Sequence, residues 1–193
     1  HYTCTSTHKD VLYPYPYLEV ITAIKYIYDH QQELHVDMSS VNVMGFSAGG
    51  HLAATYGYLY KDEELLNKCN AKANEVKPTS ICLGYATILP ENPLRSSIQR
   101  LTGGDPLLVH KVSVIEHIDG TYPKTFIWGT DDDNVVPSIH SKTMDATLTK
   151  YNVKHMYINY PHGPHGLSTS DNLSCPDNMK VDEVSINQVF LAN

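Results

Sequence analysis

The chain has 193 residues, of which 41% are hydrophobic, and its formal net charge is -7 at pH 7. A chain of this size buries one sizeable core, so we expect a single domain over residues 1–193. The acidic balance argues against nucleic acid or an anionic membrane surface as the main partner. No apolar run is long enough to cross a membrane, and no signal peptide is evident, so we expect a cytoplasmic protein. Homo-oligomerisation is compatible with this composition.

The first predicted element is a helix. Apolar residues recur at helical spacing after the segment PYPY, at Leu18, Ile21, Ile24 and Ile27, which predicts a helix from this segment to about Gln32. The next segment, Ser40 to Phe46, is short and apolar, as is typical of a buried parallel strand. A second helix is expected from Ala48.

The rest of the chain repeats this alternation. Further strands are predicted over Pro78–Tyr85, Lys124–Gly129 and Lys154–Tyr160, and further helices over Ser138–Tyr151 and Val181–Leu191. Strands that alternate with helices indicate an α/β fold with a mostly parallel sheet and helices on both faces. The polar, proline-broken connection 89–106 is expected to fold over a pocket as a cap or lid.

A serine flanked by glycines marks the turn after the first predicted strand. The sequence there is VMGFSAGGHLAA, with Ser47 two residues from Gly45 and Gly49. A serine at a sharp strand-to-helix turn adopts a strained backbone conformation, and the neighbouring chain passes so close that side chains at the flanking positions would collide. The pattern is typical of a nucleophilic serine, but a serine between glycines is also found in many ordinary turns, so the assignment depends on the rest of the sequence.

Two later loops carry the groups that such a serine needs. A hydroxyl becomes a good nucleophile when a histidine takes its proton and a carboxylate orients that histidine. The aspartates Asp131 to Asp133 follow one predicted strand, and His162 and His165 follow the last one. Loops after parallel strands meet at one edge of the sheet, and the chain order Ser, Asp, His is that of nucleophile-elbow hydrolases.

The segments GFSAGGHLAA, KTFIWGTDDDNVVP and YPHGPHGLS together resemble α/β-hydrolase fold serine esterases, in particular the acetyl-xylan esterase and carbohydrate acetyl esterase branch. The resemblance runs from about Tyr13 to the end of the chain. It implies a serine esterase that cleaves small acyl esters, acetyl groups on sugars among them, without a cofactor.

The resemblance also implies the roles of individual residues. Ser47 is the expected nucleophile, Asp132 the orienting acid, with Asp133 as the next candidate, and His165 the general base in preference to His162. The backbone N–H of Ala48, at the start of a helix, is the expected oxyanion donor.

The sequence departs from this family at its beginning. The second oxyanion donor normally comes from an early HGGG-type loop, whereas no glycine precedes Gly45 here. We therefore expect the N-terminal strands of the fold to be missing, which would leave an exposed edge beside the strand that leads to Ser47.

Two other interpretations stay open. The segment GTDDDNV also resembles prolyl-oligopeptidase-like serine peptidases, and the absent HGGG segment is compatible with a non-catalytic hydrolase-like binding scaffold. His162 and His165 have a spacing that suits zinc, but no third ligand is convincing, so we expect no metal. The four scattered cysteines are expected to be free thiols.

Overall fold

The structure is a computed structural model that describes residues 12–90 and 97–169. In this part of the chain four parallel strands form one sheet in the order β1-β2-β3-β4. The strands are β1 (Asn42–Phe46), β2 (Ser80–Gly84), β3 (Lys124–Thr130) and β4 (His155–Tyr160). All four strands predicted from the sequence are confirmed, each within two residues of its expected end.

Three helices confirm the predicted alternation. They are α1 (Tyr15–Asp29), α2 (Ser47–Leu59) and α7 (Ile139–Lys150). The predicted helix over Val181–Leu191 lies outside the described residues. So does part of the expected lid, because residues 91–96 are not described.

The short helices of the chain were not predicted. They are α3 (Glu63–Lys68), α4 (Ala73–Val76), α5 (Ser97–Thr102), α6 (Pro106–Lys111) and the 3-10 turn η1 (Val114–Glu116). Each is too short to show a helical period in the sequence. Local caps hold two of them, because Asp62 accepts the N–H of Leu65 and Asp105 accepts the N–H of Leu107.

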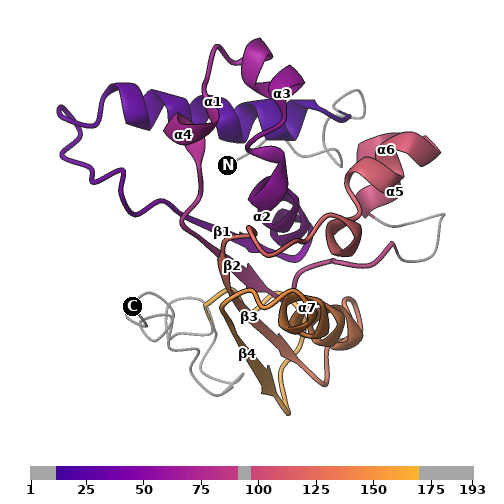
Figure 1. The fold of residues 1–193 in the computed structure, drawn as a ribbon. Helices are drawn as coiled ribbons and strands as arrows, with labels where there is room; N and C mark the ends of the chain where they lie inside the picture. Colours follow the sequence, from indigo (N-terminus) through magenta and orange to yellow (C-terminus); the bar gives the residue numbers. More distant parts are fainter. Residues whose placement is uncertain (1–11, 91–96, 170–193) are drawn as a thin grey trace.

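The strands place alternate side chains on the two faces of the sheet. One face carries Ile81, Leu83 and Ile127, which join a core with residues of α1, α2 and α7. In Figure 1, α2 and α7 lie against this face. The other face carries a second cluster of Cys82, Tyr85, Phe126, Trp128 and Leu167. Strand β2 is buried along its whole length because it lies between β1 and β3 and both of its faces are covered.

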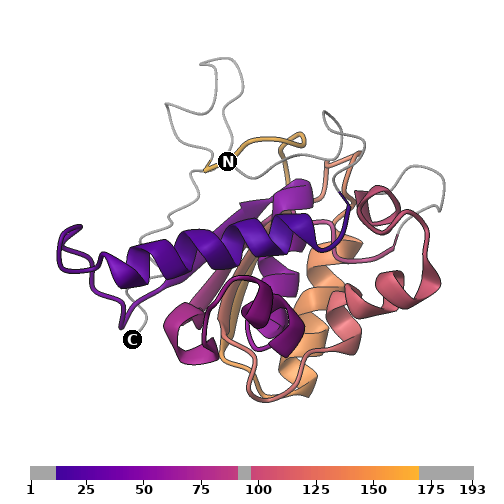
Figure 2. The same cartoon turned by 90° about the horizontal axis from the view of Figure 1, so that it is seen from above.

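Strand β1 is an edge strand in the described part of the chain. It pairs with β2 in parallel register, from Asn42 with Ser80 to Phe46 with Gly84, and its other edge has no strand partner among the described residues. Figure 2 shows the long helix α1 on this side of the sheet.

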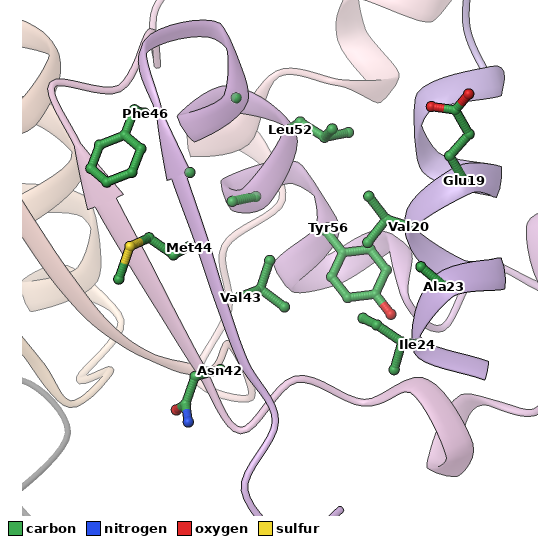
Figure 3. Close-up of a pocket in the computed structure, with 13 residues that line it drawn as sticks. Glu19, Val20, Ala23, Ile24, Asn42, Val43, Met44, Phe46, Leu52 and Tyr56 are labelled. Carbon is green, nitrogen blue, oxygen red and sulfur yellow. The ribbon is translucent and has the colours of Figure 1, made fainter. Parts of the chain in front are cut away.

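A groove of about 530 Å³ runs between this edge of β1 and the helices α1 and α2. In Figure 3 the side chain of Val43 points toward Tyr56 and Ile24, whereas Met44 and Phe46 lie on the opposite side of the strand. The groove is not lined by Ser47, Asp133 or His165. It is thus a feature of the sheet edge and is separate from the site described next.

Candidate active site

Ser47 stands at a turn with no connecting loop. Strand β1 ends at Phe46 and helix α2 begins at Ser47, whose φ of 53° lies in the left-handed region. A residue other than glycine adopts this conformation only when its surroundings hold it there. The turn leaves the hydroxyl at the carboxyl end of the sheet, which is where ligands bind in parallel α/β folds.

The flanking glycines let the chain pass closely on both sides of this turn. A Cβ on Gly45 would lie 2.1 Å from the carbonyl oxygen of Gly49, and a Cβ on Gly50 would lie 2.4 Å from Cβ of Ala86. Both distances are too short for any side chain. The glycine at position 45 thus has the role predicted from the sequence, and Gly50 lets β2 and its following loop approach α2.

His165 lies against Ser47 in the structure. Nε2 of His165 is 2.9 Å from Oγ of Ser47, and Nδ1 of His165 is 2.7 Å from Oδ2 of Asp133. An ionised carboxylate only accepts hydrogen bonds, so Nδ1 carries the proton and Nε2 of the neutral ring accepts the hydroxyl proton of Ser47. The three side chains form one line of hydrogen bonds from a carboxylate to a hydroxyl.

The acid in this line is Asp133, which corrects the sequence-based preference for Asp132. Asp132 instead contacts His162, at 2.9 Å from Oδ2 to Nδ1, in a pair whose His162 side chain is 81% exposed. The Asp133 side chain is 1% exposed and that of His165 is 19% exposed. The pair of Asp133 and His165 is therefore shielded from water, whereas the pair of Asp132 and His162 is solvated.

The turn after β3 explains which aspartate turns inward. Oδ1 of Asp133 accepts the backbone N–H groups of Val135 and Val136, both at 2.8 Å. This local turn fixes one carboxylate oxygen and leaves Oδ2 free for His165. Asp133 is buried, whereas Asp131 and Asp132 lie on the exposed side of the turn. No residue pattern distinguishes Asp133 from Asp132 in the sequence, because Asp132 also has backbone N–H groups two and three residues later.

Asp131 has a structural role beside the site. Its carboxylate accepts Nζ of Lys142 at 3.1 Å, the hydroxyl of Ser138 at 3.0 Å and the amide of Asn159 at 2.8 Å. These hydrogen bonds, that of Lys142 first, lower the pKa of Asp131. The residue ties α7 to the end of β4 and does not contact the line of Ser47, His165 and Asp133.

The expected oxyanion donor lies in the first turn of α2. Ala48 is the second residue of this helix, so its N–H is one of the first-turn groups that no carbonyl of the same helix accepts. The partial positive charge at the helix start favours a developing oxyanion there. The carbonyl of Ser47 accepts the N–H of Thr87 at 3.1 Å, which further fixes the turn to the loop after β2.

The described residues include no group of three or more metal-ligating side chains. His162 and His165 face two different aspartates, Asp132 and Asp133. Cys69 and Cys82 are free thiols, whereas Cys4 and Cys175 lie outside the described residues. Within residues 12–90 and 97–169 no helix is long and apolar enough to span a membrane.

The parallel sheet and the strand-to-helix turn at Ser47 define an α/β-hydrolase fold, and solved structures share it. An acetyl ester-xyloside bifunctional hydrolase from Caldicellulosiruptor lactoaceticus superimposes with a TM-score of 0.70 at 32% identity, covering 82% of this chain and 60% of its own. A sugar hydrolase from Lactococcus lactis gives a TM-score of 0.71 at 26% identity, covering 93% of this chain and 66% of its own.

The chain belongs to the family described as BD-FAE, whose model matches residues 5–148. It is also 25% identical over 173 residues to the endo-1,4-beta-xylanase B of Butyrivibrio fibrisolvens, covering 88% of this chain but only 27% of that protein. The chain thus spans about a quarter of this curated relative and no more than two thirds of the two solved structures. The resemblance to acetyl and carboxylic esterases of the α/β-hydrolase fold is confirmed at the level of family.

Proposed function

We propose that this protein is a serine carboxylic-ester hydrolase that cleaves small acyl esters, with acetyl esters on carbohydrates as its substrate class. The observation that carries the proposal is the hydrogen-bonded line from Asp133 through His165 to Ser47. The solved relative described as an acetyl ester-xyloside hydrolase and the xylanase relative support the choice of acetylated sugars.

The mechanism follows from this line. His165 Nε2 takes the proton of the Ser47 hydroxyl as Oγ attacks the ester carbonyl, and the same imidazole then protonates the departing alcohol. Water repeats the attack on the acyl-enzyme and restores the serine. Asp133 keeps Nδ1 protonated and stabilises the imidazolium. The N–H of Ala48 is the proposed donor to the oxyanion, and removal of one such donor typically lowers the rate by roughly 100-fold to 1,000-fold.

The decisive experiment labels the nucleophile. The purified 193-residue chain is treated with a fluorophosphonate, and peptide mass analysis locates the adduct, which we expect on Ser47. Hydrolysis of p-nitrophenyl acetate should be lost in Ser47→Ala and retained in Ser39→Ala, a control that removes an exposed hydroxyl from the loop before β1. Binding of acetylated sugar with neither labelling nor turnover would instead favour a non-catalytic scaffold.

Substrate class is tested by direct comparison. We expect release of acetate from acetylated xylo-oligosaccharide and faster hydrolysis of p-nitrophenyl acetate than of p-nitrophenyl butyrate. A peptide p-nitroanilide serves as the amide substrate, and faster turnover of this amide than of the ester would reject the esterase proposal in favour of a peptidase.

A further inference from the structure

Tyr85 stands directly after β2 in an uncommon backbone conformation. The strand ends at Gly84, and Tyr85 has a φ of 35°. Its N–H donates to the carbonyl of Trp128 at 2.8 Å, so its backbone is fixed to the neighbouring strand β3. A bulky residue with positive φ is strained and persists only when its surroundings hold it. The conformation turns the Tyr85 side chain toward the site of Ser47 and His165.

The ring of Tyr85 packs on the imidazole of His165. The two ring centroids are 4.8 Å apart with the planes at 69°, an edge-to-face arrangement. Trp128 and Phe46 contact the other sides of the tyrosine ring, at centroid distances of 5.1 Å and 5.7 Å. Tyr85 is 6% exposed. Because Trp128 and Phe46 enclose the Tyr85 ring, this ring is a rigid packing surface for the imidazole of His165.

Glycine at position 84 permits this packing. A Cβ there would lie 2.5 Å from the Phe46 ring and 2.9 Å from Nε1 of Trp128. These two rings are the ones that hold Tyr85. Gly84 thus leaves room for the rings of Phe46 and Trp128, and the next residue, Tyr85, packs its ring against the imidazole of His165.

The hydroxyl of Tyr85 holds the loop that carries His165. It accepts the backbone N–H of Ser168 at 3.0 Å, and Ser168 itself has a left-handed φ of 53°. Burial raises the pKa of Tyr85, and the charge of Asp133 adds to this rise despite the opposing effect of the Ser168 N–H. The side chain therefore contacts the His165 loop at two points, the imidazole and the Ser168 backbone.

We propose that Tyr85 is a positioning residue for His165: its ring keeps the imidazole in line between Asp133 and Ser47, and its hydroxyl anchors the loop at Ser168. This inference rests on the proposed esterase function. The imidazole faces Ser47 from α2, Asp133 from the loop after β3, and Tyr85 from the end of β2.

Two variants separate the two contacts. Tyr85→Phe keeps the ring and removes the hydroxyl, so kcat should fall by roughly 2-fold to 10-fold, the range for one lost hydrogen bond. Tyr85→Leu removes the ring as well, so kcat should fall by a further factor of about 10. KM should stay within about twofold for both, because Tyr85 acts on the base and not on the bound ester. The matched control is Tyr58→Phe, which loses a hydroxyl that donates to the carbonyl of Lys111 at 3.0 Å.

The pH profile distinguishes positioning from general loosening of the fold. Loss of the ring loosens the imidazole from Asp133, which stabilises the imidazolium, so the acidic limb of kcat/KM should move to lower pH in Tyr85→Leu and keep the wild-type position in Tyr85→Phe. An unchanged limb in Tyr85→Leu together with wild-type kcat would overturn the proposal. If Tyr85→Leu does not fold, as judged by circular dichroism, wild-type kcat in Tyr85→Phe overturns the anchoring role of the hydroxyl.

A spectroscopic measurement keeps this test independent of turnover. The proton between His165 Nδ1 and Asp133 should give a downfield proton NMR resonance in the resting protein, and this resonance should broaden or shift in Tyr85→Leu and stay sharp in Tyr58→Phe. If the wild-type chain is neither labelled nor active, the proposed esterase function fails, while this resonance still reports whether Tyr85 positions the imidazole. An unchanged resonance in Tyr85→Leu would contradict the inference.

Discussion

The carboxylate of Asp133 lies 2.7 Å from the imidazole of His165, although the two residues are 32 positions apart in the chain. The contact links the loop after β3 to the loop after β4, two neighbouring parallel strands. The parallel register between these strands, from Thr125 with His155 to Thr130 with Tyr160, brings both loops to the carboxyl end of the sheet. The geometry of the site is therefore a consequence of strand order.

This contact predicts different results for two adjacent aspartates. Asp133→Asn should lower kcat for p-nitrophenyl acetate by roughly 1,000-fold to 10,000-fold, because an amide no longer fixes the imidazole tautomer or stabilises its charge. Asp132→Asn should change kcat by less than about threefold, since an exposed ion pair contributes little. Both variants remove one negative charge in the same turn, so each is the control for the other. A larger loss in the Asp132 variant would contradict the corrected assignment.

The close approach at the Ser47 turn predicts the effect of adding one methyl group. In Gly50→Ala the new Cβ meets Cβ of Ala86 at 2.4 Å, with the backbone behind it unable to yield easily. We expect a loss of roughly 1–3 kcal/mol in the free energy of unfolding, the usual range for overpacking. Gly120→Ala is the control, because the atom nearest to its new Cβ would be the Tyr151 carbonyl oxygen at 3.5 Å, an ordinary contact. Urea unfolding followed by circular dichroism measures both, and equal midpoints for the two variants would contradict the packing argument.

Much of the fold was predictable because its signals are local. The strands and long helices follow from apolar runs and helical spacing, and Ser47 and His165 stand in short patterns with glycine at fixed positions. The choice between Asp132 and Asp133 was not predictable, because both residues have the same side chain. Only the backbone conformation of the turn decides which carboxylate faces inward.

The role of Tyr85 could not be predicted from the sequence, for a different reason. It is one of 14 tyrosines and stands in no recognisable pattern. Its contacts with His165 and Ser168 bring together residues about 80 positions apart, which spacing alone does not reveal.

Burial also makes a prediction about thiol chemistry. Cys82 is 2% exposed at the centre of the sheet, and this burial raises the pKa of its thiol to about 12. The thiolate is the reactive form, so Cys82 should resist iodoacetamide at pH 8 in the folded protein and react in guanidinium chloride. Half-buried Cys69 should react at least about 10 times faster in the folded state, because reagent can reach it. Peptide mass mapping measures both rates, and rapid native modification of Cys82 would contradict its burial.

The burial of the His51 imidazole makes the stability of the fold depend on pH. It lies one turn after Ser47 in α2, is 2% exposed, and its Nε2 is 2.9 Å from the carbonyl oxygen of Val112. Burial lowers the pKa of His51 to about 4, although the Val112 carbonyl partly opposes this. In the unfolded chain the pKa of histidine is about 6.5. As pH falls from about 6.5 to about 4, the unfolded chain therefore takes up a proton that the folded protein does not, and the free energy of unfolding falls by about 3 kcal/mol.

His51→Gln isolates this effect, because glutamine keeps a donor for the Val112 carbonyl but does not titrate. Urea unfolding at several pH values should show a flatter decline between pH 6.5 and 4 for this variant than for the wild type. The control is His35→Asn, since His35 is exposed with a φ of 53°, a conformation that asparagine tolerates, and it should keep the wild-type slope. Carboxylates that also titrate in this range contribute equally to all three proteins. Parallel curves for His51→Gln and the wild type would show that the buried imidazole does not resist protonation, and acid unfolding would then originate elsewhere in the fold.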